Sequence, residues 1–498
     1  MPALAGDLRK DGAALESHTT AAEGLLARLP APAGREPGQR QAARAIHQAC
    51  HSLRARFLEL HVDQVYEDLT EDRRVHHRLD DVAYAAAALF PGLVPSRRQV
   101  AAEHALAQAD REGREIAQGV FFHALLRSHR CGPHLLDAML RPTPRAKELL
   151  PEFQRCGHLD LGAVTVERHG SAAHLTLCRP HSLNAENDAS VEAMETAVDL
   201  ALLDDGVQVV ALRGGPMTHP RYSGRRVFSS GIDLKDLRRG RISFLAFFLR
   251  RELGYVHKLM RGIVLDDEAE AWPDRTVTKP ALAVVDTFAI GGGAQLLPLF
   301  DHVLAGTDSY VSLPAAQEGI VPGAANLRLG RKVGGRLARQ LILGGRRIWA
   351  GEDDARVFFD EVVEPQSMDA AVGRALDRLD DRAVPANRRM LCLAEEPPHA
   401  FQAYMAEYAL QQVVRVHSED VAGRLARFGE RGDGGEHDSH DGHDGRGGHD
   451  GRGRHDSHAH HDSHGGHDSH GGHDSHAEHA SHSDHDSRTG RATLTGHP

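Results

Sequence analysis

Residues 289–296 read AIGGGAQL, which is an apolar strand-like segment followed by three glycines and the start of a helix. A second stretch of the same kind, FSSGIDLKDL, occupies residues 228–237. Glycine at a strand-to-helix turn permits unusual backbone dihedrals and lets a ligand approach closely. The helix that follows offers unsatisfied N–H groups and the positive end of its dipole. Two such turns facing each other would aim the amides of Ile232 and Gly292 at one oxygen atom, which is the design of an oxyanion hole.

A glycine-rich turn alone is weak evidence of function, because many strand-to-helix turns contain glycine for packing reasons. The sequence adds a third segment, LPAAQEGIVPGA at residues 313–324, followed by GGRR at 344–347 and DEVV at 360–363. In this order and spacing the segments resemble the crotonase (enoyl-CoA hydratase/isomerase) superfamily over about residues 160 to 365. The resemblance implies a spiral of ββα units, assembly as a homotrimer or homohexamer, and an acyl-CoA thioester whose carbonyl oxygen lies between the two amides.

The sequence departs from the hydratases of this superfamily at two positions. Hydratases carry one glutamate two residues after the glycine triplet and another seven residues before the proline of the GxxPG segment, because adding water requires a general base and a general acid. Here these positions hold Gln295 and Ala315. Since an amide and a methyl group neither remove nor deliver a proton at neutral pH, we do not expect hydration of an enoyl-CoA.

A closer resemblance covers residues 1 to about 425 and includes the same two departures: this stretch resembles the cofactor-independent dioxygenases of dihydroxyphenylglycine formation in glycopeptide-antibiotic pathways. It implies that a dihydroxyphenylacetyl-CoA thioester and O2 give the arylglyoxylate and free CoA through an enolate, without metal or flavin. The family's functional positions are matched by the catalytic residues Ile232, Gly292 and Gln295, and by the substrate-binding residues Glu186, Arg251, Gly231, Gly293 and Val321. The resemblance does not identify the base that removes the Cα proton.

Residue types alone leave other interpretations open. Glu186 also fits a carboxylate at the start of a helix, and Arg251 also fits a solvated residue on a helix face. The same oxyanion hole would serve a thioesterase or a double-bond isomerase acting on an acyl-CoA. Loss of both glutamates would also fit a non-catalytic scaffold whose tail buffers metal. Uptake of O2 distinguishes the dioxygenase from all of these alternatives.

Composition limits the class of protein. The chain has 498 residues, of which 41% are hydrophobic and only 5% aromatic, as is typical of two or three globular domains packed with small aliphatic side chains. Its formal net charge of −11 gives no electrostatic reason to expect nucleic acid or an anionic membrane as a partner. Its five cysteines are scattered, and neither a leader peptide nor a membrane span is visible, so we expect a cytoplasmic protein.

The sequence predicts an α/β fold: a crotonase-like ββα spiral core with a helical N-terminal domain and a helical C-terminal segment. Apolar residues follow helical spacing in residues 1–155, β-branched runs alternate with helices in 156–345, and helical spacing returns in 346–429, a segment expected to serve oligomerisation. Residues 430–498 form a His-, Asp- and Gly-rich tail that is too poor in apolar residues to fold. Its imidazoles could bind divalent metal or remain solvated; we expect neither a catalytic metal nor another cofactor.

Overall fold

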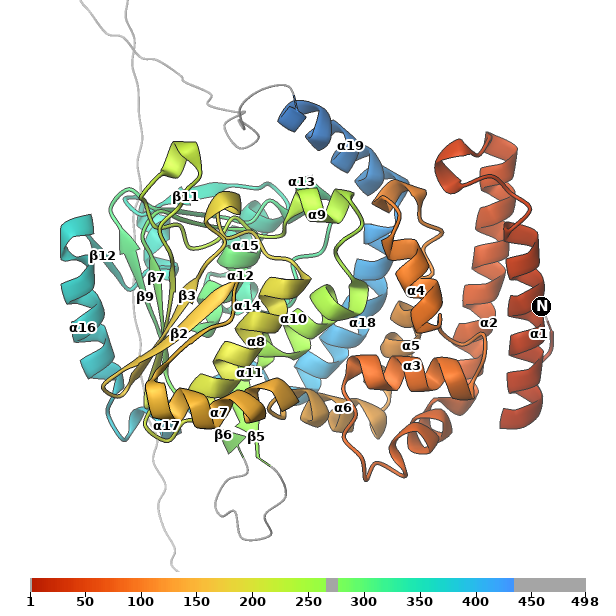
Figure 1. The fold of residues 1–498 in the computed structure, drawn as a ribbon, viewed down its shortest axis with the longest axis horizontal. Helices are drawn as coiled ribbons and strands as arrows, with labels where there is room; N and C mark the ends of the chain where they lie inside the picture. The colour runs from red at the N-terminus through yellow and green to blue at the C-terminus, as the bar shows by residue number, and fades with distance from the viewer. Residues whose placement is uncertain (1, 266–275, 434–498) are drawn as a thin grey trace, which may run out of the picture. The chain divides into compact units, whose positions relative to one another are not determined.

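The computed structural model describes residues 2–265 and 276–433, all of which belong to one compact unit (Figure 1). Residues 430–433, the first of the predicted tail, lie at the end of a helix. The rest of that tail, with the histidines predicted to bind metal, lies outside the described residues. Within the described ranges, no helix is both long enough and apolar enough to cross a membrane.

The N-terminal part of the chain consists of helices, as predicted. Asp7 and Thr143 cap two of them by accepting a hydrogen bond from the backbone N–H three residues later. Gly157 ends the last helix in a left-handed conformation with φ of 70° and turns the chain into the first strand. The helices are α1 (Leu8–Leu26), α2 (Pro37–Thr70), α3 (Leu79–Leu89), α4 (Arg97–His104), α5 (Glu115–Arg127), α6 (Cys131–Leu140) and α7 (Pro144–Cys156).

A seven-stranded mixed sheet forms the centre of the α/β part. Its first three strands pair antiparallel, whereas β3, β4, β7, β9 and β12 pair parallel. In sheet order the strands are β1 (His158–Asp160), β2 (Val164–His169), β3 (Ala172–Leu177), β4 (Val209–Gly214), β7 (Ala281–Val285), β9 (His302–Gly306) and β12 (Glu361–Val363).

The parallel strands are almost continuous runs of apolar residues because both of their faces are covered. In β7, Ala283 and Val285 join the main core, which includes α8, while Leu282 and Val284 pack with α16 on the other face. The helices around the sheets are α8 (Asp188–Leu203), α9 (Leu234–Arg238), α12 (Gly292–Leu296), α13 (Ala315–Glu318), α14 (Ala325–Lys332), α15 (Gly335–Ile342) and α16 (Met368–Leu379). The predicted α/β class is therefore confirmed.

Two smaller sheets complete the core. Strands β11 (Arg347–Trp349), β10 (Tyr310–Ser312) and β8 (Phe288–Ile290) form one, and β5 (Ile263–Val264) and β6 (Thr276–Val277) form the other. The predicted strand, glycine turn and helix of AIGGGAQL are β8, Gly291 and α12. In FSSGIDLKDL the predicted strand shortens to a single bridge at Ser229, because the Ser229 hydroxyl binds the Gly231 N–H and the Asn184 carbonyl.

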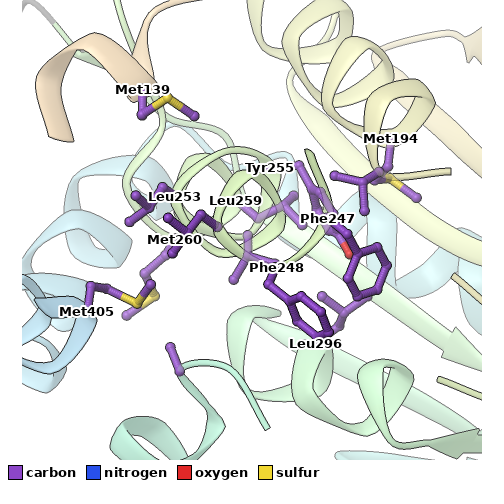
Figure 2. Packing of buried hydrophobic residues seen from close by; sticks show 14 of the residues in the cluster. Met139, Met194, Phe247, Phe248, Leu253, Tyr255, Leu259, Met260, Leu296 and Met405 are labelled. Atoms are coloured by element: carbon purple, nitrogen blue, oxygen red, sulfur yellow. The ribbon is translucent and has the colours of Figure 1, made fainter. Parts of the chain in front are cut away.

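One helical segment passes through the middle of the core. A π-helical turn, Phe244–Leu249, leads into α10 (Arg250–Leu253) and α11 (Tyr255–Arg261). Figure 2 shows its apolar side chains pointing outward on several sides. The surrounding side chains include Met139 of α6, Met194 of α8, Leu296 of α12 and Met405 of α18 (Pro398–Val416). This segment therefore joins the helical N-terminal part, the α/β core and the C-terminal helices.

Of the C-terminal helices, α17 (Val384–Glu395) contacts α11, whereas α18 packs against α5 and α6 of the N-terminal part. The last helix, α19 (Glu419–Asp433), contacts α9 and the short helical turn Gln108–Asp110. The ring of His123 on α5 lies 2.8 Å from the Ala406 carbonyl of α18, and the Gln402 amide donates to the Leu126 carbonyl at 2.9 Å. Within the helical segment predicted for residues 346–429, the chain breaks where α18 ends at Val416 and α19 begins at Glu419.

A buried ion network attaches the central helical segment to α8. Lys258 Nζ lies 2.9 Å from Glu195 Oε1 and 2.7 Å from Asp199 Oδ1, and all three side chains are fully buried. Arg78 and Arg250 also bind Glu195. Lys258 and the two arginines together hold the pKa of Glu195 well below its usual range.

Replacing Lys258 with Met should lower the free energy of unfolding by about 3 kcal/mol, because Glu195 and Asp199 would lose a buried counter-ion. Urea unfolding followed by circular dichroism measures this loss. The matched control is Lys235→Met at an exposed position of α9, for which we expect a change within about 0.5 kcal/mol. Equal stability of the two variants would show that the network contributes no net stability.

Candidate active site

Backbone hydrogen bonds lock the first glycine turn between two neighbouring segments. The Glu186 N–H donates to the Gly231 carbonyl at 2.7 Å, and the Asp233 N–H donates to the Glu186 carbonyl at 2.8 Å. On the other side, the Ile290 N–H of β8 donates to the Ser229 carbonyl at 2.9 Å. The turn is thus fixed against the chain before α8 and against the strand that carries the second turn.

The two amides predicted to form an oxyanion hole lie in these facing turns. Gly231 has φ of 88°, which favours glycine, and a β-carbon built there would lie 3.0 Å from the Gly292 nitrogen. Neither the Ile232 N–H nor the Gly292 N–H donates a hydrogen bond to any described residue. Both donors are therefore available to one bound oxygen atom.

One cavity collects most of the residues that the sequence singles out. Gly231 and Gly293 shape the turns beside it, and a β-carbon at Gly293 would lie 2.9 Å from the Ser229 Cβ. The predicted residues that line it are Glu186, Ile232, Arg251, Gly292, Gln295 and Val321. The remaining lining residues are Phe247, Phe248, Glu252, Gly291, Leu313, Ala315, Glu318, Ile320, Gly323 and Tyr408.

The buried guanidinium of Arg251 connects these residues. Its Nε donates to Glu186 Oε2 at 3.0 Å, and its Nη2 donates to the Gly292 carbonyl at 2.9 Å. Its Nη1 donates to Glu252 Oε1 at 2.6 Å and to Gln295 Oε1 at 3.0 Å. The two carboxylates raise the pKa of Arg251 well above its usual value, so this side chain carries a permanent positive charge.

Gly292 requires glycine for steric reasons. A β-carbon at this position would lie 2.1 Å from Glu186 Oε2 and 3.2 Å from Arg251 Nη2. The Glu186 carboxylate also accepts a hydrogen bond from the Tyr255 hydroxyl at 2.6 Å. Burial raises the pKa of Tyr255 well above its usual value, which keeps its hydroxyl protonated as a donor.

Sequence reasoning missed Glu252, Tyr255, Glu318 and Tyr408. Tyr255 lies four residues after Arg251, so helical spacing could have placed the two together. The chain bends at Gly254, however, between α10 and α11. Tyr408 belongs to α18, and no local sequence pattern connects that helix with the glycine turn at Gly291, which lies more than 80 residues earlier in the chain.

The loop that carries Val321 is held by side chains from α10 and α18. The Val321 N–H donates to Gln412 Oε1 at 2.8 Å, and the Tyr404 hydroxyl donates to the Gly323 carbonyl at 2.5 Å. Glu252 Oε2 accepts the Ala324 N–H at 2.9 Å. Glu252 therefore links the Arg251 network to this loop.

A larger, open hollow of about 610 Å³ lies between the outer face of the main sheet and α16. It contains neither glycine turn, so the smaller cavity is the one positioned for chemistry on a carbonyl group. Among the described residues, no group of three or more His, Cys, Asp or Glu side chains is arranged to hold a metal ion.

Comparison with known proteins identifies the family to which the chain belongs. It is 54% identical over 418 residues, 84% of this chain and 96% of the relative, to the (3,5-dihydroxyphenyl)acetyl-CoA 1,2-dioxygenase of Amycolatopsis orientalis. The chain belongs to this dioxygenase family. Residues 167–391 of the present chain also match the sequence profile of the enoyl-CoA hydratase/isomerase family. This match confirms the predicted crotonase-like core.

More distant relatives match about half of the chain. A probable enoyl-CoA hydratase of Rhizobium meliloti is 27% identical over 54% of this chain and 98% of its own. Among solved structures, an enoyl-CoA hydratase/isomerase from Xanthobacter autotrophicus is 24% identical, with a TM-score of 0.45 over 54% of this chain and 94% of its own. Residues 1–155 of the present chain lie outside the part that matches the enoyl-CoA hydratase/isomerase profile.

Arg250 and Arg251 have different surroundings although they are neighbours on α10. Arg250 Nε donates to Glu195 Oε2 at 2.8 Å, within the Lys258 network, and its side chain does not line the cavity. Arg251 is 4% exposed and binds within the cavity. The interpretation of Arg251 as a solvated helix residue is therefore wrong.

Substituting Arg251 with Ala should lower the free energy of unfolding by about 3 kcal/mol, because Glu186 and Glu252 would remain buried without their counter-ion. Arg251→Lys keeps the charge but cannot bind four acceptors at once, and we expect a loss of about 1–2 kcal/mol. Chemical unfolding of both variants, and of the exposed control Arg239→Ala, measures whether Arg251→Ala loses more stability than Arg251→Lys. A loss below about 0.5 kcal/mol for Arg251→Ala would contradict this account.

Proposed function

We propose that the protein converts (3,5-dihydroxyphenyl)acetyl-CoA and O2 into (3,5-dihydroxyphenyl)glyoxylate and CoA, without a metal or organic cofactor. The observation that carries the proposal is the pair of unpaired amides at Ile232 and Gly292, in a chain 54% identical to an enzyme named for this substrate. Gln295 and Ala315, where hydratases have acids, also line the cavity, which argues against hydration.

Catalysis begins with enolate formation. When the thioester loses a Cα proton, negative charge moves onto its carbonyl oxygen, where the N–H groups of Ile232 and Gly292 stabilise it. Each donor in such a position contributes about 3 kcal/mol to the stability of the transition state. The aryl ring conjugates with the enolate and makes it electron-rich enough to reduce O2 directly.

The oxidation then balances without a further reductant. The enolate transfers two electrons to O2 and forms a Cα–O bond, which gives a Cα peroxide. The terminal peroxide oxygen attacks the thioester carbon and expels CoA thiolate, closing a four-membered cyclic peroxide. Loss of the second Cα proton and cleavage of the O–O bond give the α-keto acid. Both atoms of O2 end in the product, and both Cα protons are accounted for by the CoA thiol and the carboxylic acid.

The lining of the cavity suits this sequence of steps. Phe247 and Phe248 come from the π-helical turn, and Leu313 and Ile320 come from the segments on either side of α13. Figure 2 shows the two phenylalanine rings side by side next to Leu296. Apolar walls admit O2 and exclude water, which would otherwise return a proton to the enolate.

The polar side of the cavity supports binding of the dihydroxyphenyl ring. Each Glu186 oxygen accepts one hydrogen bond within the protein and keeps a lone pair for a ring hydroxyl. Gln295 lies within the same network through Arg251. The product is an arylglyoxylate, which a transamination step converts to an arylglycine, in keeping with a role in antibiotic biosynthesis. Assembly as a homotrimer or homohexamer stays a prediction.

Purified protein should consume one O2 for each CoA released from (3,5-dihydroxyphenyl)acetyl-CoA, and activity should survive EDTA and removal of residues 434–498. The proposed steps require neither a metal nor the tail. An oxygen electrode combined with a thiol assay measures both quantities. Release of CoA without O2 uptake would indicate a thioesterase, and activity that EDTA abolishes and iron restores would contradict the cofactor-free mechanism.

Substituting Gln295 with Glu should slow O2 uptake while leaving substrate affinity within a few fold. A carboxylate here would join Glu186 and Glu252 around one guanidinium and oppose formation of the negatively charged enolate. Steady-state kinetics with the oxygen electrode checks kcat and KM separately. The control is Gln366→Glu at an exposed position; equal kcat for the two variants would remove Gln295 from the reacting centre.

A further inference from the structure

The proposed reaction needs a base that removes the Cα proton, and three carboxylates line the cavity: Glu186, Glu252 and Glu318. The two glutamates of the hydratases are absent, because their positions hold Gln295 and Ala315. The choice of base therefore rests on the proposed function and on the partners of each carboxylate.

Glu186 and Glu252 are already engaged. Glu186 accepts hydrogen bonds from Arg251 and Tyr255, at 3.0 and 2.6 Å. Glu252 accepts from Arg251 and from the Ala324 N–H, at 2.6 and 2.9 Å. Both carboxylates are thus committed to partners within the protein that hold neighbouring segments in place. Among the described residues, none forms a hydrogen bond or ion pair with the Glu318 carboxylate.

The position of Glu318 relates it to the lost acid. It lies three residues after Ala315 in α13, and side chains at this spacing project from the same face of a helix. Both side chains line the cavity that contains the two oxyanion amides. A carboxylate missing at position 315 is thus replaced by one carried a single helical turn further on.

The charged groups near α13 leave this carboxylate free. Arg415 Nε donates to the Gly319 carbonyl at 2.8 Å, and Arg424 Nη1 donates to the Ala316 carbonyl at 2.7 Å. The Arg415 guanidinium also pairs with Asp420. These arginines bind the backbone at the end of α13 and hold the turn in place, while Arg251 is occupied by its own four acceptors.

The proton affinity of Glu318 suits a base that works near neutral pH. Burial without a compensating cation raises the pKa of its carboxyl group to about 7. A general base is most effective when its pKa lies near the working pH, because it is then both ionised and strong enough to accept a proton.

We propose that Glu318 is the catalytic base of the enolisation step. A Glu318 oxygen forms a bond to the Cα proton, the C–H bond breaks, and its electron pair becomes the enolate held by Ile232 and Gly292. The proton then passes from Glu318 to the departing CoA thiolate. The restored carboxylate removes the second Cα proton as the cyclic peroxide opens.

Exchange of the Cα protons for deuterium tests this role apart from the oxidation. Incubated with (3,5-dihydroxyphenyl)acetyl-CoA in D2O without O2, the unchanged protein should incorporate deuterium at Cα. Glu318→Gln should slow this exchange at least about 100-fold, the usual contribution of a general base, while the Kd of the thioester by calorimetry stays within a few fold. Glu148→Gln, which removes an exposed carboxylate of α7, should match the unchanged protein.

Two further measurements separate a base from a structural residue. Exchange by the unchanged protein should fall as the pH drops below about 7, because Glu318 becomes protonated, and the residual exchange of Glu318→Gln should lack this dependence. If Glu318→Gln fails to fold, Glu318→Ala serves instead, and added formate should restore part of its exchange.

The outcomes distinguish this inference from the proposed function. If the unchanged protein consumes O2 and Glu318→Gln exchanges at more than one tenth of its rate, Glu318 is not the base although the dioxygenase proposal stands. If the unchanged protein exchanges deuterium through Glu318 but consumes no O2, the base is confirmed and the dioxygenase proposal fails. Absence of both exchange and O2 uptake in the unchanged protein overturns both.

Discussion

The buried guanidinium of Arg251 is the interaction on which the candidate site depends. A charge withdrawn from water is tolerated only if its donors are paired, and here the partners come from separate segments. Glu186 precedes α8, Glu252 is the next residue on α10, and Gln295 and the Gly292 carbonyl belong to α12. Pairing these acceptors with one planar group fixes their positions relative to each other. The glycine turn at Gly292 is thereby tied to α10 and to the segment before α8.

The same guanidinium divides the three carboxylates of the cavity into two that are paired with it and one that is not. Glu186 and Glu252 both form ion pairs with Arg251, at 3.0 and 2.6 Å. Glu318 has no such partner among the described residues, and burial alone sets its pKa. In the proposed reaction, Arg251 thus leaves one of the three carboxylates without a counter-ion and able to take up and release a proton.

Sequence patterns predict the parts of this protein that depend on local chemistry. Apolar β-branched runs locate β4 and β7, and the glycine triplet locates the turn between β8 and α12. The partners of Arg251 were not predictable in this way, because Glu186 lies 65 residues before it and Gln295 lies 44 residues after it. Glu318 escaped notice because a carboxylate in a four-residue helix looks like a surface residue until the cavity is known.

Replacing the hydratase acids has a kinetic consequence for the proposed reaction. An enolate beside an acidic group or a water molecule recovers its proton quickly, so O2 must react before reprotonation. Gln295 and Ala315 remove two proton donors from the cavity, and the apolar residues Phe247, Phe248 and Ile320 exclude water. In the proposed reaction, protonated Glu318 is then an acid that lines the same cavity as the enolate. The competition between O2 and the return of the proton from Glu318 then decides how much enolate becomes product.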